Sequence, residues 1–222
     1  MGSVGGNRSA GQIRDYLLGR LNDALRRPGR YGGELALRIH VDALGFVDDV
    51  GDPVRRWHDA LRDSGGANAI GVRGAAADVL PDGCAEYVTA SVYAELAYQL
   101  GWLRADRLLA PEAYRRLVDG IGEWCREDRT LGDVLAAYGP PSVSIGSTNP
   151  YYPKSFVYVA AAAAPVTLHL WNELDPTPGD EIRSAFPEPV LLAYRRGAVS
   201  GSGAGRFGDS FGYTPEGAKR KP

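Results

Sequence analysis

The hydrophobic period of the sequence changes at Gly139, and this change constrains the fold more than any other feature. Upstream of Gly139, apolar residues recur every three to four positions, which is typical of amphipathic helices. Downstream, apolar and polar residues alternate in short runs, as in strands with one covered face. Pro140 and Pro141 lie between the two regions. Proline neither continues a helix nor donates a ladder hydrogen bond, so the helical region ends here and the chain continues in an extended conformation. We therefore expect an α+β fold, in which the helical N-terminal two thirds cover one face of a small C-terminal antiparallel β-meander of about four strands.

Helical spacing predicts six helices in the first part of the chain. They span residues 12–27, 34–49, 52–63, 84–102, 111–128 and 130–139. The second segment also alternates like a strand, but its length and its alanine and leucine content favour a helix. The two long helices at 84–102 and 111–128 are expected to pair with each other, and "AIGVRG" at 69–74 is read as a short strand.

Four strands are predicted after the prolines, at residues 142–146, 155–162, 166–174 and 189–196. In the third strand, the apolar side chains Val166, Leu168 and Leu170 alternate with Thr167, His169 and Trp171. Short connections favour antiparallel pairing of neighbouring strands, which gives the meander.

A single domain is expected, because 222 residues with 44% hydrophobic content can form one core. Glycine, serine and charged residues dominate residues 1–8 and 197–222, so we predict a flexible N-terminus, a domain at 9–196 and a flexible Gly/Ser-rich tail. The tail also carries Phe207, Phe211 and Tyr213 within seven residues. The alternative is therefore that these rings dock into a groove on this molecule or on another.

Charge and hydropathy exclude two classes of partner. The formal net charge is −2, with acidic and basic residues interleaved, so no broad cationic surface is expected for nucleic acid. No apolar run reaches the roughly 18–20 residues that cross a bilayer, and the start of the sequence lacks a signal-peptide pattern. We expect a cytoplasmic protein that contacts neither nucleic acid nor membrane.

No catalytic, metal-binding or cofactor-binding motif is present, so we assign no catalytic residue, no metal and no cofactor. The two cysteines, Cys84 and Cys125, are expected to be buried and reduced. The three histidines, His40, His58 and His169, have no second histidine at helical metal-binding spacing and are interpreted as structural or surface residues.

The loop "STNPYYPK" at 147–154 is the strongest candidate for a binding site. Its two prolines stiffen the backbone, which lowers the entropy lost on binding, and tyrosine is well suited to protein recognition. One of the two tyrosines is expected to be a core residue and the other to be exposed. A plain structural turn is the alternative interpretation. The predicted partner-binding residues are Asn149, Tyr151, Tyr152 and Lys154 of the loop, with His169 and Trp171 of the meander.

The segment "TLGDVLAAYGPPSVSIG" resembles the helix–proline–strand unit of the β-lactamase-inhibitor protein and of outer-membrane assembly lipoproteins. The segments "RRPGRYGGELALRIHVDALGFVDD", "GPPSVSIGSTNPYYPK" and "LHLW" are similar to uncharacterised immunity-like bacterial proteins found beside secreted toxins. This resemblance implies a non-enzymatic binding protein, an immunity or inhibitor protein that occludes a toxin or an enzyme. It implies no catalytic residue.

The alternative function is that of a small-molecule-binding protein or enzyme, with a pocket between the helices and the sheet. His169 and Glu173 are then the acid–base candidates, because residues four apart on a strand share a face. At roughly 3.3 Å per residue they lie about 13 Å apart, too far for a direct hydrogen bond.

Overall fold

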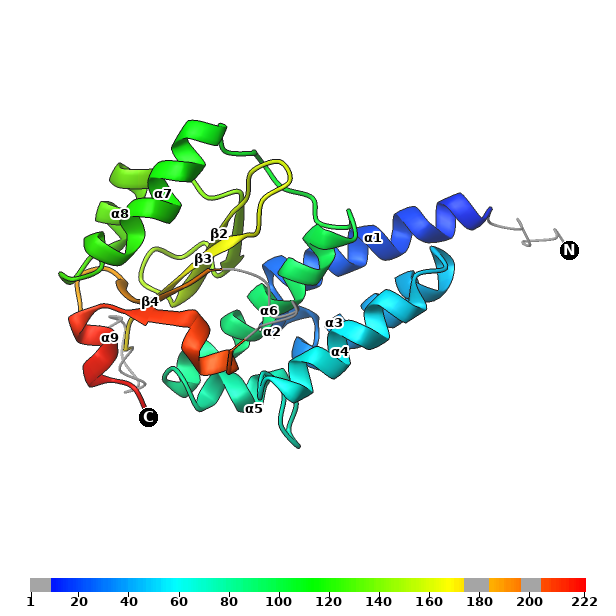
Figure 1. The fold of residues 1–222 in the computed structure, drawn as a ribbon, viewed down its shortest axis with the longest axis horizontal. Helices are drawn as coiled ribbons and strands as arrows, with labels where there is room; N and C mark the ends of the chain where they lie inside the picture. Colours follow the sequence, from blue (N-terminus) through cyan, green and yellow to red (C-terminus); the bar gives the residue numbers. More distant parts are fainter. Residues whose placement is uncertain (1–8, 174–183, 197–204) are drawn as a thin grey trace, which may run out of the picture.

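The computed structural model describes residues 9–173, 184–196 and 205–222, and it has the α+β architecture that the sequence predicts (Figure 1). Helices fill the chain before the prolines, and an antiparallel sheet follows. The helices are α1 (Ala10–Arg26), α2 (Pro28–Tyr31), α3 (Gly33–Val47), α4 (Gly51–Asp63), α5 (Val72–Ala77), α6 (Asp82–Gln99), α7 (Pro111–Trp124), α8 (Leu131–Tyr138) and α9 (Pro215–Lys219). The strands are β1 (Val143–Gly146), β2 (Lys154–Tyr158), β3 (Val166–Trp171), β4 (Val190–Arg196) and β5 (Phe211–Tyr213), with a 3₁₀ turn, η1, at Phe207–Ser210.

The sheet is a meander in the order β1-β2-β3-β4-β5, with every neighbouring pair antiparallel. In the centre of the sheet Ser155 of β2 lies opposite His169 of β3, which lies opposite Ala193 of β4. The register shifts between His169 and Leu170. The meander is therefore confirmed, and its fifth strand comes from the segment that was predicted to be a flexible tail.

Both faces of the sheet are covered, whereas the sequence predicted one. One core joins α6 and the N-terminal helices to Val143, Ile145 and Val157 of the sheet. A second core joins α7 and α8 to side chains of the opposite face, such as Phe156 and Leu168. As a result all six residues of β3 are buried. The predicted pairing of α6 with α7 is wrong, because these helices lie on opposite faces of the sheet (Figure 1).

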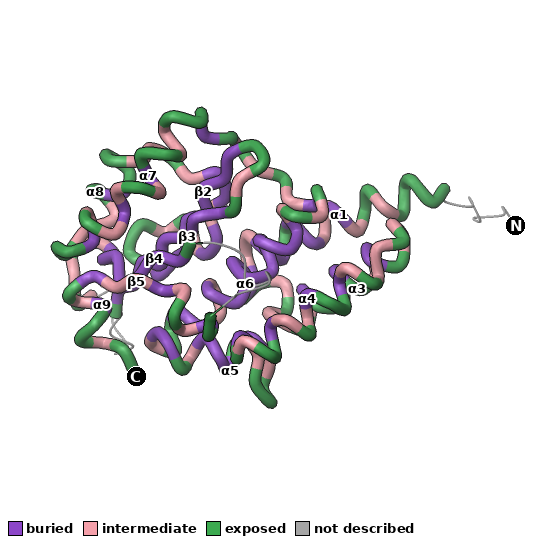
Figure 2. Tube along the Cα trace, in the orientation of Figure 1, coloured by how far each residue is buried: buried purple, intermediate pink, exposed green. Residues whose placement is uncertain are grey.

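Helix α6 is buried on nearly all sides and forms the centre of the molecule (Figure 2). Its buried hydroxyl groups bond within the helix, with Thr89 Oγ1 donating to the Ala85 carbonyl at 2.7 Å and Ser91 Oγ to the Val88 carbonyl at 2.7 Å. Its Glu95 carboxylate pairs with Arg195 of β4 at 2.7 Å. No helix in the described residues has the length and apolar content to cross a bilayer.

The segment at 69–74 forms the start of α5 instead of the predicted strand. Only an isolated bridge joins Asn68 and Gly71. Gly71 has φ +107°, and the next two backbone N–H groups, of Val72 and Arg73, donate to the Glu34 carboxylate, each at 2.9 Å. A carboxylate is a favourable cap for a helix N-terminus, so Glu34 of α3 stabilises this helix from a distant part of the chain.

The predicted flexible tail is wrong for residues 205–222, which fold onto the domain. Phe207 and Phe211 are buried in the core that contains α6, and β5 pairs with β4. Thr214 Oγ1 donates to the Leu191 carbonyl at 2.7 Å and caps α9. The rings of Phe207 and Phe211 therefore dock on this molecule, and the edge of β4 pairs with a segment too polar to fold alone. Residues 1–8 and 197–204, also predicted to be flexible, lie outside the described residues.

Candidate functional site

The loop between β1 and β2 is held in one conformation by a set of local hydrogen bonds. The side chain of Ser147 accepts from the Asn149 N–H at 3.0 Å, and the Asn149 side chain accepts from the Tyr151 N–H at 3.0 Å. The Lys154 ammonium donates to the Asn149 carbonyl at 2.8 Å. The two short-range side-chain bonds mimic backbone turns, so Asn149 organises the loop.

The two tyrosines of the loop differ in exposure. Tyr151 is 44% exposed, and Tyr152 is half-buried. Neither ring belongs to a hydrophobic core, so the expectation of one core tyrosine is wrong. Lys154 is buried, and this burial, together with the charge of Arg27, lowers the pKa of its ammonium group. Tyr151 is therefore the more accessible of the two rings, and the buried Lys154 stabilises the loop through its hydrogen bond to Asn149.

A groove of about 230 Å³ lies beside this loop. One wall is the turn at 146–148, and the opposite wall is α2 with Arg27 and Arg30. Glu86 and Tyr87 of α6 complete the lining. The Arg27 guanidinium donates to the Gly146 carbonyl and joins the two walls. The loop and the groove, which we call the loop–groove surface, combine an exposed tyrosine with two arginines.

The two predicted partner-binding residues of the meander lie inside the molecule. His169 is 1% exposed, its Nδ1 lies 2.8 Å from the Ser155 hydroxyl, and its ring stacks on Phe211. Burial, with a smaller effect of Arg195, lowers the pKa of His169 to about 3. Trp171 is 7% exposed, and the guanidinium of Arg220 lies 4.3 Å from the centroid of its ring. Neither side chain is part of an open surface.

The two acid–base candidates are also separated by their environments. The His169 ring is enclosed between α6 and β5, whereas the Glu173 side chain is exposed and lies 3.9 Å from Arg220. The geometry does not bring them together as a catalytic pair.

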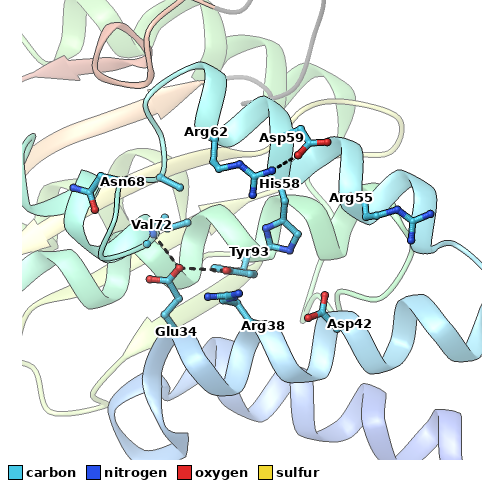
Figure 3. Close-up of a pocket in the computed structure, with 12 residues that line it drawn as sticks. Glu34, Arg38, Asp42, Arg55, His58, Asp59, Arg62, Asn68, Val72 and Tyr93 are labelled. Atoms are coloured by element: carbon cyan, nitrogen blue, oxygen red, sulfur yellow. Dashed lines mark hydrogen bonds and ion pairs between the residues drawn. The ribbon is translucent and has the colours of Figure 1, made fainter.

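A second concavity, which the sequence did not predict, is a cleft of about 350 Å³ between α3, α4, α5 and α6 (Figure 3). Its charged lining comes mainly from α3 and α4. Glu34 is already bonded to the start of α5 and accepts from the Tyr93 hydroxyl at 3.3 Å. Burial raises the pKa of Tyr93 and lowers that of His58. Both groups are therefore neutral at pH 7.

This cleft, which we call the charged cleft, has two charged side chains with no close partner among the residues that the structure describes. Arg62 pairs with Asp59, and Arg55 pairs with Asp52. Arg38 and Asp42 of α3 make no side-chain hydrogen bond or ion pair with any residue that the structure describes, and both are exposed at the rim. From the sequence, His58 was expected to be a structural or surface residue. The spacing of Glu34, Arg38 and Asp42, four residues apart on one helix face, was the available signal.

No protein-family model matches the chain, and comparisons with curated proteins and with solved structures found no match. No group of three or more histidine, cysteine or acidic residues is arranged to hold a metal within 9–173, 184–196 and 205–222. The loop–groove surface is therefore assessed by its geometry alone.

Proposed function

We propose that this protein is a non-enzymatic binding protein that recognises a protein partner with the loop–groove surface. The observation that carries the proposal is the hydrogen-bonded loop, which presents Tyr151, 44% exposed, beside a groove. A loop that is already ordered loses little entropy on binding, and a tyrosine brings a large contact area with few rotatable bonds.

The size and chemistry of the groove favour a peptide segment over a small molecule. Its volume of about 230 Å³ is below the roughly 300–1,000 Å³ of typical small-molecule pockets. Arg27 and Arg30 line it, and arginine and tyrosine are enriched among the residues that contribute most to protein interfaces. A partner segment with an acidic residue next to an apolar one would complement this surface.

The proposal extends to an inhibitor or immunity role in the cytoplasm, with a toxin or an enzyme as the partner. Cys84 and Cys125 are both free and buried, which fits a reducing compartment. The alternative function, a small-molecule pocket between helices and sheet, has weaker support, because the ring of His169 is buried whereas the Glu173 side chain is exposed and lies near Arg220.

Selection from a library of random twelve-residue peptides tests the proposal. Peptides enriched on the wild-type protein should lose about tenfold or more in affinity for the Tyr151→Ala and Arg30→Ala variants. The Leu108→Ala variant, altered at an exposed residue elsewhere, should retain them. Tyr151, Arg30 and Leu108 are exposed, so the melting temperature of each variant should equal that of the wild type.

Two results would contradict the proposal. One is a library that yields no peptide binding at micromolar concentration. The other is a set of binders whose affinity is the same for the wild-type, Tyr151→Ala and Arg30→Ala proteins, since these peptides would bind another surface. If a partner protein is identified, for example the product of a neighbouring gene, the same three variants rank its binding.

A further inference from the structure

The outer face of α3 exposes three large apolar side chains to solvent. Leu35 is 67% exposed, Ile39 is 56% exposed and Phe46 is 88% exposed. Their spacing of four and seven residues places all three on one face of the helix, opposite the buried Leu37, Val41 and Leu44. Large apolar side chains grouped on one exposed helix face mark an interaction site more often than isolated exposed residues do.

Arg38 and Asp42, the two charges of the charged cleft without a close partner, lie along one edge of the same face. They are four residues apart, yet they make no ion pair with each other. An arginine placed N-terminal to an acidic residue is the less favourable order for such a pair within a helix. Each charge is therefore available to a group from outside the chain.

This pattern is complementary to itself when a second α3 packs against it in the antiparallel direction. With the two-fold axis next to residue 40, Arg38 of each copy lies level with Asp42 of the other. At about 1.5 Å per residue, Leu35 is then offset by about 1.5 Å from the Phe46 of the second copy, and the two Ile39 residues by about 3 Å. In a two-fold arrangement the same helix edges meet, so both opposite-charge pairs form at once.

We propose that a second copy of this chain occupies the outer face of α3, forming a two-fold dimer. The order of the charges favours a second copy over an unrelated helix. The partner surface must present an anion opposite Arg38 and a cation opposite Asp42, and a second α3 presents both. Helix α1 widens the contact at the Phe46 end. It exposes Ile13 and Tyr16 there, beside Arg14, which pairs with Asp48 at 2.6 Å.

The dimer surface is separate from the loop–groove surface, so either proposal can fail without the other. The chain has a mass of 23.8 kDa, and sedimentation equilibrium should give a mass that rises toward twice this value with concentration. Phe46→Ser should raise the dimer dissociation constant by about tenfold or more, since it removes the largest and most exposed apolar side chain of the face. Leu108→Ser, a matched change at an exposed leucine outside α3, should leave the dissociation constant unaltered.

A charge exchange tests the pairing itself. Arg38→Asp places two acidic residues level with each other in the dimer and should raise the dissociation constant by about tenfold. Asp42→Arg should have a similar effect. The double variant Arg38→Asp/Asp42→Arg restores opposite charges and should return the constant to within about threefold of the wild type.

Cysteine cross-linking tests the register. Ile39→Cys lies near the two-fold axis and should form an intermolecular disulfide on oxidation, whereas the two copies of Phe46→Cys are about 18 Å apart along the helices and should not. The native cysteines, Cys84 and Cys125, are buried and give a low background.

Three outcomes would overturn the proposal. The first is a protein that remains monomeric at about 100 μM, a concentration well above a micromolar dissociation constant. The second is a dimer that persists in Phe46→Ser, Arg38→Asp and Asp42→Arg, which would place the contact on another surface. The third is a charge-exchanged double variant that stays as monomeric as the single variants, which would indicate that Arg38 and Asp42 bind a different ligand or partner.

Discussion

At the scale of single residues, the ionisation of His169 links folding to pH. Its ring is 1% exposed, and burial lowers its pKa to about 3. The unfolded chain binds a proton near pH 6.5, so between about pH 6.5 and 3 the unfolded state holds more protons and stability falls as pH falls. His40 and His58, whose pKa values are also lowered by burial, add to this effect. We predict that the free energy of unfolding decreases by at least about 1 kcal/mol per pH unit below pH 6.

Urea unfolding at pH 7, 6 and 5 measures this dependence, and His169→Gln is the matched variant. Glutamine keeps a partner for Ser155 and does not titrate, so the stability difference between the two proteins should shrink as pH falls. Asp48 and Glu216 do not interfere, because their pKa values are lowered and their contributions are lost only below the usual carboxylate range. Parallel pH profiles for the two proteins would contradict the prediction.

Residue patterns predicted the candidate site only in part. The loop at 147–154 had a structural turn as its alternative interpretation, and the hydrogen bond that the Tyr151 N–H donates to the Asn149 side chain agrees with that local chemistry. His169 and Trp171 were placed at the surface, because alternation along a strand defines two faces but not what covers each one. Arg38 and Asp42 were missed, since a helix face with mixed charge is usually a solvated face, and their lack of partners depends on the fold.

At the scale of elements, the sequence predicted a helix or strand correctly where the signal was local. The capping box at Thr130 and Asp133 is present at the start of α8, and Gly139 ends that helix with φ +69°. Helix α5 was missed because its cap, Glu34, lies 38 residues before Val72. The C-terminal segment was missed because its composition is that of a flexible chain, and its order comes from contacts with β4.

The close packing of α9 against β4 gives a prediction for Gly217. A Cβ atom at this position would overlap the carbonyl oxygen of Leu192. Gly217→Ala should therefore destabilise the protein by about 2 kcal/mol or more, as overpacking does, and lower Tm by roughly 4 °C or more. Thermal unfolding followed by circular dichroism measures the change. Limited proteolysis should also cleave the C-terminal segment sooner.

Gly120→Ala in α7 is the control for this experiment. A Cβ atom at Gly120 meets nothing within 4 Å, so the variant should be stabilised by about 0.5–1 kcal/mol through the higher helix propensity of alanine. If Gly217→Ala melts like the wild type and resists protease equally, residues 205–222 do not pack on the domain in solution.

At the scale of the whole molecule, the sequence predicted the order of helices and strands but not the layers. Helices α7 and α8 precede the sheet in sequence and cover the face opposite α6. The chain reaches that face through the connection before α7, where the Asp106 N–H donates to the Ser142 carbonyl at 2.8 Å and the Leu109 N–H to the Val159 carbonyl at 2.8 Å. Such long-range contacts leave no periodic signal in the sequence. The apolar stripe of a short helix can pack on either face of a sheet, so the pattern does not predict which face α7 and α8 cover.

The ion pair between Glu95 and Arg195 joins the central helix to the sheet, and it gives the last prediction. Its atoms lie 2.7 Å apart, and both side chains are at most 2% exposed. Arg195→Met should destabilise the protein by about 3–5 kcal/mol, because the Glu95 carboxylate would remain buried without its main cation. Glu95→Leu/Arg195→Met should recover a large part of this loss, since it removes both charges and keeps apolar volume.

Urea unfolding of the single and double variants measures these differences, with Arg196→Met as the control. Arg196 follows Arg195 on β4 and is exposed, and it donates to the Val118 carbonyl at 2.9 Å, so its loss should cost about 1 kcal/mol or less. If Arg195→Met is no less stable than Arg196→Met, the pair does not hold α6 against the sheet. If the double variant is as unstable as Arg195→Met alone, the loss reflects packing around β4, and the charge of Glu95 has no part in it.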